Sequence, residues 1–290
     1  GSSLQLHTDG RSVLSLAWKF PEADPLKDWN SYIDLQIGAF KNSLKAINLS
    51  DTFLSLTAGL DTRTIFSALI HVGLSIPACT MTGNPISLDA MTARSLCKFY
   101  GFHHEMIFLN ESFYKNLPDY ILQASRLSGG LSSLEQAHEI FFNERAHNLA
   151  GNRLSGNLGN QICRRGVEKT SMRNINLSIL NEQLIRTKKE YSGDYWFINL
   201  GRDKGDINYE FLLQNEVPFT SVANYCIGSN FSIQQTPYAN RRLIENLHRM
   251  PLDDYTLKPL SHSQMRLRDL QHRFLGHSKS SSFQIKLIKE

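Results

Sequence analysis

The segment Thr57-Ala-Gly-Leu-Asp-Thr62 carries residue types that bind phosphate and a metal ion together. Gly59 allows the backbone to approach an oxyanion closely, and the hydroxyls of Thr57 and Thr62 can donate to phosphate oxygens. Asp61 would repel a phosphate unless a cation lay between the two, so it is a candidate Mg²⁺ ligand. An ordinary turn from a strand into a helix, with Asp61 as the N-cap, explains the same residues. Both interpretations remain open at this point.

A second glycine-containing segment, Gly156-Asn-Leu-Gly159-Asn160, lies much further along the chain. It follows Arg153-Leu-Ser155, which is short and apolar enough to be a strand. Glycine next to a strand is found where a ligand or another backbone approaches closely. The segment is therefore a second candidate for a ligand-facing loop.

These two segments need elements that bring them together. The apolar patterns predict strands at 12–18, 52–57, 77–82, 104–108 and 153–155. Helical spacing predicts helices at 26–44, 63–71, 88–100, 114–125, 134–149, 179–190, 209–215, 240–248 and 263–274. Strands alternating with helices are typical of a parallel α/β sheet, whose ligands gather at the carboxyl ends of the strands. We therefore expect an α/β fold with a parallel sheet flanked by helices and a mostly helical C-terminal half after about residue 110.

The composition is that of a globular chain with a sizeable core, with 290 residues, 41% of them hydrophobic and 20% charged. The longest apolar stretches are too short to cross a bilayer, so no membrane partner is expected. A net charge of +4 argues only weakly for nucleic acid, which is therefore not expected as a partner either. The four cysteines lack metal-ligand spacing and are interpreted as reduced thiols of a cytoplasmic protein: Cys79, Cys97, Cys163 and Cys226.

The first segment resembles the Ser-Gly-Gly-X-Asp-Ser pyrophosphate loop of the PP-loop ATP pyrophosphatases. Two further stretches are similar to the asparagine-synthetase-like branch of that family. One comprises Thr80-Met-Thr82, Asp89, Ala93, Gly101 and His104-Glu105, which match its strand–helix–strand passage. The other, Leu154-Ser-Gly-Asn-Leu-Gly-Asn-Gln161, falls where the branch has a Ser-Gly-Glu-Gly-Ser-Asp-Glu loop. The resemblance covers about residues 45 to 260 and identifies the chain as a divergent member.

This resemblance implies an adenine-nucleotide α-hydrolase-like fold that binds ATP and Mg²⁺, adenylates a carboxylate and forms an amide bond, as an amidotransferase or a cyclase does. Residues carried over to the nucleotide are Leu56, Thr57, Ala58, Gly59, Asp61, Thr62, Met81, Ser155 and Gly156. Asp61 and Asn160 are carried over as metal ligands, and Asp61, Asn157 and Asn160 as catalytic positions. A cation is expected to stabilise the departing pyrophosphate, with Lys258, Arg266, Arg268 and Lys286 as candidates.

The second loop departs from the family at three chemically important positions. Asn157, Asn160 and Gln161 stand where the asparagine-synthetase branch has carboxylates. An amide oxygen can still bind Mg²⁺, but it brings no charge and cannot act as a base. Two hypotheses follow: an active, AMP-forming ligase with a changed acceptor, or a non-catalytic domain that keeps the fold as a binding or scaffold module.

Residues 1–45 are interpreted as an N-terminal strand and helix that lead into an ATP-binding domain at 46–290. Gly1-Ser2-Ser3 is interpreted as a cloning remnant, and native segments can be missing at either end. The expected substrate is a carboxylate on a small molecule, a peptide or a sugar acid. The nitrogen comes from a glutaminase domain, from a separate glutaminase subunit or from an amine on the substrate, and the sequence does not decide among these.

Overall fold

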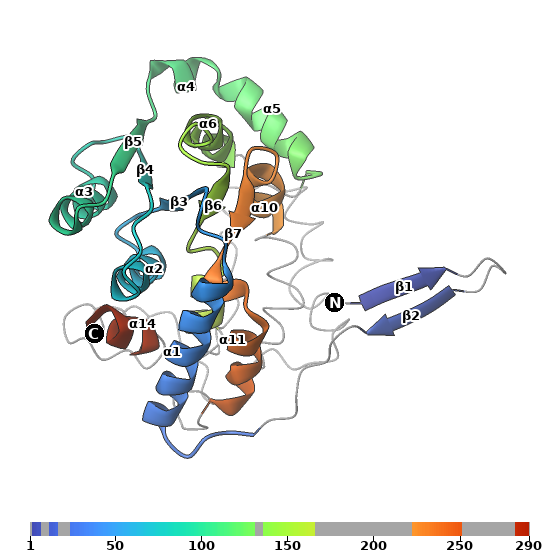
Figure 1. Cartoon of the computed structure of the whole chain (residues 1–290). Helices are drawn as coiled ribbons and strands as arrows, with labels where there is room; N and C mark the ends of the chain where they lie inside the picture. Colours follow the sequence, from blue (N-terminus) through green and yellow to red (C-terminus); the bar gives the residue numbers. More distant parts are fainter. Residues whose placement is uncertain are drawn as a thin grey trace, which may run out of the picture.

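The computed structural model describes residues 2–6, 12–16, 24–130, 136–165, 222–250 and 282–289 (Figure 1). The helices predicted at 179–190, 209–215 and 263–274 lie outside these ranges, as do Lys258, Arg266 and Arg268. Near the N-terminus, β1 (Ser2–Leu6) pairs antiparallel with β2 (Ser12–Leu16). Ser2 and Ser3, which we interpreted as a cloning remnant, thus take part in a strand pairing.

The centre of the fold is a five-stranded sheet in the order β5-β4-β3-β6-β7 (Figure 1). Its strands are β3 (Thr52–Ser55), β4 (Ala78–Thr82), β5 (His104–Phe108), β6 (Asn152–Leu154) and β7 (Ile233–Gln235), and every pairing is parallel. The expected α/β class, a parallel sheet flanked by helices, is confirmed. The sequence does not predict β7, because its three residues are too few for a clear alternating pattern.

Helices cover both faces of the sheet, and the strands supply side chains to both. On one face pack α1 (Trp29–Ala46), α2 (Leu60–His71), α3 (Leu88–Tyr100) and α14 (Ser282–Lys289). On the other lie α4 (Glu111–Lys115), α5 (Leu117–Leu127), α6 (Ala137–Ala146) and α10 (Val222–Gly228). Leu54 joins the first cluster and Phe53 the second, since neighbouring residues of a strand point to opposite faces.

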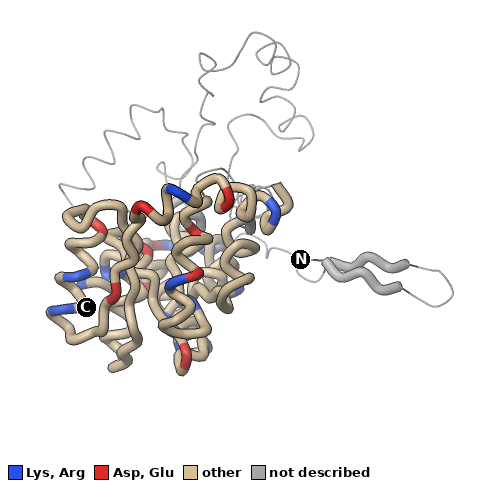
Figure 2. The backbone as a smooth tube through the Cα atoms, turned by 90° about the horizontal axis from the view of Figure 1, so that it is seen from above, with Lys and Arg blue, Asp and Glu red and all other residues tan. Residues whose placement is uncertain are grey.

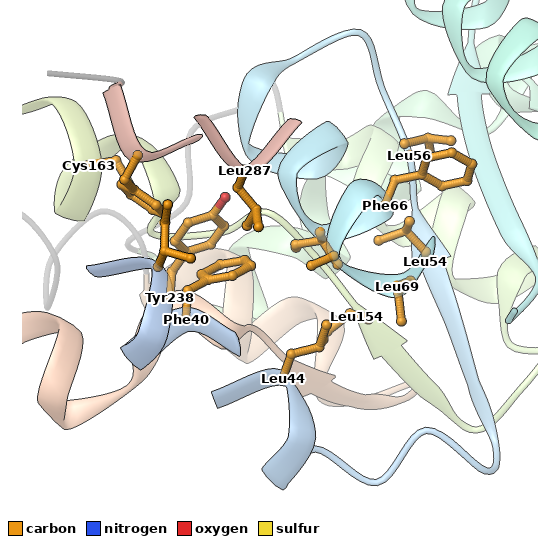
Figure 3. Close-up of a cluster of buried hydrophobic side chains, with 14 of the residues drawn as sticks. Phe40, Leu44, Leu54, Leu56, Phe66, Leu69, Leu154, Cys163, Tyr238 and Leu287 are labelled. Carbon is orange, nitrogen blue, oxygen red and sulfur yellow. The ribbon is translucent and has the colours of Figure 1, made fainter. Parts of the chain in front are cut away.

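The first cluster is the larger core and includes residues from distant parts of the chain. Figure 3 shows Phe40 of α1, Leu154 of β6 and Leu287 of α14 packed together with residues of α2 and β3. Tyr238, from the 3₁₀ turn Pro237–Ala239, belongs to the same cluster. The rings of Phe40 and Tyr238 have centroids 5.0 Å apart. The C-terminal helix α14 is therefore part of the same packed body as the central strands.

Several helix ends follow directly from capping residues. Asp28 accepts a hydrogen bond from the Ser31 backbone N–H at 2.9 Å, so α1 begins at Trp29. Ser87 caps α3 in the same way, and Gly101 ends it in the left-handed conformation at φ 73°. The predicted and observed bounds of α3 accordingly coincide.

Other predicted helices are interrupted or shortened. The helix expected at 114–125 is two helices, α4 and α5, separated at Asn116. Pro118 lies in the first turn of α5, where its missing N–H is tolerated, but it cannot continue a helix from α4. The helix expected at 240–248 consists of α11 (Arg241–Glu245) and a 3₁₀ turn at Asn246–Arg249.

Charged residues of both signs are spread over the described backbone (Figure 2). Within the described part of the chain, no helix combines the length and the apolar character that a membrane crossing requires.

Candidate functional site

The strand order creates a switch point between β3 and β6. The chain runs from β3 to β4 and β5 on one side, whereas β6 continues to β7 on the other. In open parallel sheets the crevice for a ligand lies at the carboxyl ends of the two strands where this direction reverses. The loops after β3 and β6 comprise residues 56–59 and 155–159, which include most of the predicted site residues.

The two glycine-containing loops touch each other. A Cβ atom built on Gly156 would lie 2.9 Å from the Asp61 Cβ, and one built on Gly159 would lie 2.5 Å from the Asp61 Cγ. Side-chain carbons do not approach this closely, so both glycines are required for the contact. The loop after β6 is thereby packed against Asp61 and the first turn of α2.

The hydroxyls of Thr57 and Thr62 hold the first loop in shape. Their Oγ1 atoms lie 3.0 Å apart, within hydrogen-bond distance. The Thr57 N–H donates to the Thr62 hydroxyl at 3.1 Å, and the Gly59 N–H donates to the Thr57 hydroxyl at 3.1 Å. The loop is thus a preorganised turn at the N-terminus of α2, where the helix dipole favours negative charge.

Asp61 does not cap α2. The N-cap is Gly59, which has no side chain to accept a capping bond, and Asp61 lies inside the first turn. The capping interpretation of Asp61 is therefore wrong. Its Oδ1 instead accepts a hydrogen bond of 2.7 Å from Gln284 Nε2. Its backbone carbonyl accepts one of 2.9 Å from the hydroxyl of Tyr238.

Asp89 is a neighbour of the first loop that the sequence reading did not count as a site residue. It lies in the first turn of α3, and its Oδ1 accepts a hydrogen bond of 2.7 Å from the Ala58 N–H. The loop amide therefore already binds an anionic oxygen, which is the kind of partner that a phosphate would supply. Ala58 is absent from the described residues with positive φ, so alanine fits here without backbone strain.

The second loop is held by β7 and by the residue that follows it. The Ser155 N–H donates to the Gln235 carbonyl at 2.9 Å, and the Thr236 hydroxyl donates to the Asn157 carbonyl at 2.8 Å. Leu158 has φ 68°, which is unfavourable for a residue with a side chain. Such strain persists only where the surroundings over-determine the backbone. Asn160 follows Gly159 directly and begins a π-helical turn, Asn160–Arg165.

The two residues carried over to the adenine pocket differ in accessibility. Leu56 is fully buried, its N–H donates to the Cys79 carbonyl at 2.9 Å, and its carbonyl accepts from the Thr80 hydroxyl at 2.7 Å. Met81 in β4 is partly exposed. Of the candidate pyrophosphate cations, only Lys286 lies in the described part of the chain, where it pairs with Asp34.

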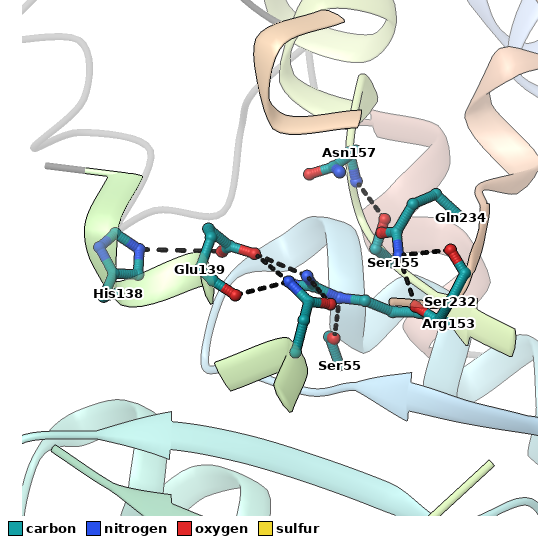
Figure 4. Close-up of polar contacts among 9 residues, drawn as sticks. Ser55, His138, Glu139, Arg153, Ser155, Asn157, Ser232 and Gln234 are labelled. Carbon is teal, nitrogen blue, oxygen red and sulfur yellow. Dashed lines mark hydrogen bonds and ion pairs between the residues drawn. The ribbon is translucent and has the colours of Figure 1, made fainter. Parts of the chain in front are cut away.

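A largely buried ion pair between Arg153 and Glu139 joins β3, β6 and α6 beneath the second loop (Figure 4). Arg153 donates to Glu139 Oε2 at 2.6 Å, to Asn143 Oδ1 at 3.2 Å and to the Ser55 hydroxyl at 2.7 Å. Burial by itself would raise the pKa of Glu139, but the charge and hydrogen bond of Arg153 outweigh it and lower that pKa. The pair therefore ties together the two strands that define the switch point.

The cysteines do not enter this site as nucleophiles. Burial raises the pKa of Cys79 to about 12 and that of Cys97 to about 11, so both thiols are protonated at neutral pH. Cys163 is also buried, in the core beside Tyr238. None of the four cysteines forms a disulfide bond.

The described residues include a ligand type that a magnesium-bound nucleotide requires. They contain no group of three or more His, Cys, Asp or Glu side chains that could hold a metal alone. Mg²⁺ at a nucleotide site needs only one or two carboxylates, because phosphate oxygens and water supply its other ligands. Asp61, in the first turn of α2, supplies one such carboxylate.

Replacing Gly159 with alanine is expected to destabilise the protein by about 2 kcal/mol, because the new methyl group would collide with the Asp61 carboxyl and force the loops apart. The same change at Gly38 is the control. Gly38 lies inside α1, and a Cβ there would meet no atom within 4 Å. We expect Gly38→Ala to stabilise the protein by about 0.5–1 kcal/mol. Urea unfolding of both variants measures the difference, and equal effects would contradict the contact.

Comparisons with known proteins find distant structural similarity. No family model matches the chain, and no curated protein matches it in sequence. Similar solved structures include NMN synthetase from Francisella tularensis, with 12% identity, a TM-score of 0.32, and coverage of 78% of this chain and 98% of that one. NH3-dependent NAD synthetase from Campylobacter jejuni has 13% identity, a TM-score of 0.32, and coverage of 71% and 95%. NAD+ synthetase from Burkholderia pseudomallei has 14% identity, a TM-score of 0.30, and coverage of 89% and 93%. At these TM-scores no argument about activity rests on the likeness.

Proposed function

We propose that this protein binds ATP with Mg²⁺ at the switch point between β3 and β6, adenylates a carboxylate and assists amide bond formation. The observation that carries the proposal is the seating of Gly156 and Gly159 against Asp61 at the carboxyl ends of these strands. A turn with preorganised amides at a helix N-terminus, a carboxylate beside it and a second small-residue loop together suit a magnesium-bound polyphosphate.

The first loop would hold the phosphates. Thr57, Ala58, Gly59 and Thr62 would present N–H groups and hydroxyls at the N-terminus of α2. The Thr57 and Gly59 N–H groups now donate to threonine hydroxyls of the loop, so a phosphate oxygen would have to share or replace those bonds. Because the Ala58 N–H is bonded to Asp89, a phosphate oxygen would have to take the place of the Asp89 carboxylate or share the amide with it. Leu56 and Met81 would lie along the adenine, and Ser155 and Gly156 beside the nucleotide.

Asp61 and the second loop would lie beside the α-phosphate, where the reaction takes place. A Mg²⁺ ion there would offset the negative charge that builds on the α-phosphate and the departing pyrophosphate. Asp61 would hold the ion through its carboxylate, and Asn160 could add an amide oxygen. Asn157 would face the acceptor. As a neutral group it cannot take a proton from an amine, so the attacking amine must reach the site unprotonated or lose its proton to another group.

The substrate class is a carboxylate on a small molecule, a peptide or a sugar acid, with nitrogen from an internal amine or from a glutaminase partner. In the adenylation step the carboxylate oxygen bonds to the α-phosphorus while the bond to the pyrophosphate oxygen breaks. In the second step the amine bonds to the acyl carbon and AMP leaves. The amine proton passes to solvent or to a nearby base.

The test is ATP–pyrophosphate exchange with Mg²⁺ across a panel of carboxylic acids, run beside direct titration of ATP. Exchange that requires one class of acid establishes adenylation and names the substrate class. ATP binding without exchange for any acid in the panel favours the alternative, a non-catalytic nucleotide-binding module. Absence of both binding and exchange from folded protein removes the nucleotide proposal.

A further inference from the structure

The C-terminal helix α14 delivers one polar side chain into the candidate site. Phe283 and Leu287 are buried in the large core, and the Phe283 ring lies 5.9 Å from that of Phe40. The Ser67 hydroxyl of α2 donates to the Leu287 carbonyl at 3.2 Å. Between these anchors Gln284 is fully buried and points at Asp61, 223 positions away in sequence.

Each two of the three residues Gln284, Tyr238 and Asp61 are joined by a hydrogen bond. Gln284 Nε2 donates to Asp61 Oδ1 at 2.7 Å and to the Tyr238 hydroxyl oxygen at 3.1 Å. The Tyr238 hydroxyl in turn donates to the Asp61 backbone carbonyl at 2.9 Å. Two separate donors therefore fix both the backbone and the carboxylate of Asp61.

The chemical type of the donor indicates what this arrangement is for. A lysine or arginine in the place of Gln284 would also hold Asp61, but it would cancel the negative charge that attracts a cation. A neutral amide orients the carboxylate and leaves its charge available. Turning the amide over would set Gln284 Oε1 against the carboxylate oxygen, so the donating orientation is the consistent one. Gln284 Oε1 is itself buried and has no hydrogen-bond partner among the described residues. The orientation that lets Gln284 Nε2 donate to Asp61 therefore leaves its own carbonyl oxygen without a hydrogen bond.

We propose that Gln284 is a positioning residue of the nucleotide site, which acts with Tyr238 to orient the Asp61 carboxylate toward a divalent cation. The cation part of this inference rests on the proposed function. Residues that hydrogen-bond to a metal-binding carboxylate typically change metal affinity by 10- to 100-fold when they are replaced. The site therefore depends on the C-terminal helix as well as on the two loops.

A matched control for Gln284 exists in α1. Gln36 is also almost fully buried, and its Nε2 donates to a tyrosine hydroxyl, that of Tyr32, at 2.9 Å. Its Nε2 also donates to the Leu243 carbonyl at 3.4 Å, and its Oε1 accepts from Asn246 Nδ2 at 3.4 Å. None of these bonds involves Asp61, Tyr238 or Gln284. Gln36→Leu therefore reproduces the loss of a buried amide without touching the candidate site.

The experiment compares Gln284→Leu, Gln36→Leu and the unaltered full chain. Both variants are expected to lower Tm by about 5 °C, because each leaves buried polar groups without a partner. Only Gln284→Leu is expected to raise the Mg²⁺ concentration for half-maximal ATP binding, by about 10-fold. Its effect on Tm should also shrink in an Asp61→Ala background, whereas that of Gln36→Leu should not. An unchanged Mg²⁺ requirement in Gln284→Leu, with ATP still bound, would overturn the inference.

Two further arms keep this inference separate from the proposed function. The first measures Tm with Mg²⁺ alone, and we expect the cation to raise Tm of the unaltered chain more than that of Gln284→Leu. Such a difference without any ATP binding would sink the nucleotide proposal and leave the positioning role standing, whereas no response to Mg²⁺ would overturn the positioning role. The second arm uses the isosteric Gln284→Glu, in case the leucine variant does not fold. A second carboxylate beside Asp61 should make its Tm respond more strongly to Mg²⁺, and a response equal to that of the unaltered chain counts against the inference.

Discussion

Replacing Asp61 with asparagine is expected to reduce ATP–pyrophosphate exchange by at least about 100-fold, the scale on which loss of a charge-stabilising group acts in an active site. Asparagine has the shape of aspartate, and its amide oxygen can still accept the hydrogen bond from Gln284. The close contact with Gly159 is kept for the same reason. The substitution removes only the negative charge of the carboxylate. That charge contributes more to Mg²⁺ binding than the neutral amide oxygen that remains.

Exchange rates of the purified Asp61→Asn protein measure this, with thermal unfolding as the check on folding. Asp119→Asn is the control, because Asp119 is an exposed carboxylate in the first turn of α5, on the other face of the sheet from α2. We expect the control to retain its exchange rate. An Asp61→Asn protein that keeps exchange within about twofold would remove Asp61 from the metal site and shift attention to Asp89.

Replacing Arg153 with methionine is expected to lower the free energy of unfolding by about 2–4 kcal/mol, because it leaves the mostly buried Glu139 carboxylate without its charged partner. The Ser55 hydroxyl and the Asn143 amide oxygen lose a donor in the same step. Methionine preserves most of the apolar stem, including packing near the Phe142 ring, over which the guanidinium now lies 4.5 Å from the centroid. The expected loss is therefore electrostatic and not a cavity effect.

An exposed ion pair of the same length provides the control for this variant. Arg241 lies 2.6 Å from Glu245 on the surface of α11, and Arg153 lies 2.6 Å from Glu139. Arg241→Met is expected to change the free energy of unfolding by no more than about 0.5 kcal/mol, since an exposed pair is screened by water. Chemical unfolding of both variants gives the comparison. Similar losses would show that burial does not decide the strength of these pairs.

The Arg153 variant should also differ from the unaltered chain in its pH dependence. In the unaltered chain the pKa of Glu139 is lowered, so its contribution to stability is present above the carboxyl's unfolded pKa and is lost as pH falls through the folded value. Without Arg153, its charge and hydrogen bond no longer oppose burial, so the pKa of Glu139 is higher than in the unaltered chain. The buried carboxyl then takes up a proton more readily, and the deficit of Arg153→Met shrinks as pH is lowered from 7. A deficit that is constant between pH 7 and pH 4 would contradict this account.

Local signals in the sequence were sufficient for the elements around the first loop. The strand at 104–108 and the helix at 88–100 have the predicted bounds, because Ser87 and Gly101 mark the helix ends and a short alternating run marks β5. The turn before α2 was likewise recognisable from Gly59 and its flanking threonines. Each of these features depends on residues within a few positions of one another, so propensity and capping are enough to predict it.

The same local signals misled where the tertiary context decides. The segment at 114–125 has helical spacing throughout. Pro118 is compatible with the first turn of α5 but not with the interior of one continuous helix, because it lacks a backbone N–H. Residues 233–235 form a strand only because β6 lies beside them and supplies hydrogen bonds. The spacing of apolar residues does not report such partners.

From the sequence alone, the α/β class, the strands β3, β4, β5 and β6, and the two glycine-containing loops could be determined. Only the tertiary structure decided that Gly156 and Gly159 rest on Asp61, that Asp89 binds the Ala58 amide, and that Gln284 and Tyr238 hold Asp61 from 223 and 177 positions away. The physical reason is the range of the interactions. Strands and helices depend on backbone preferences over a few residues, whereas the surroundings of Asp61 depend on how α14, α3 and the loop after β6 pack around α2.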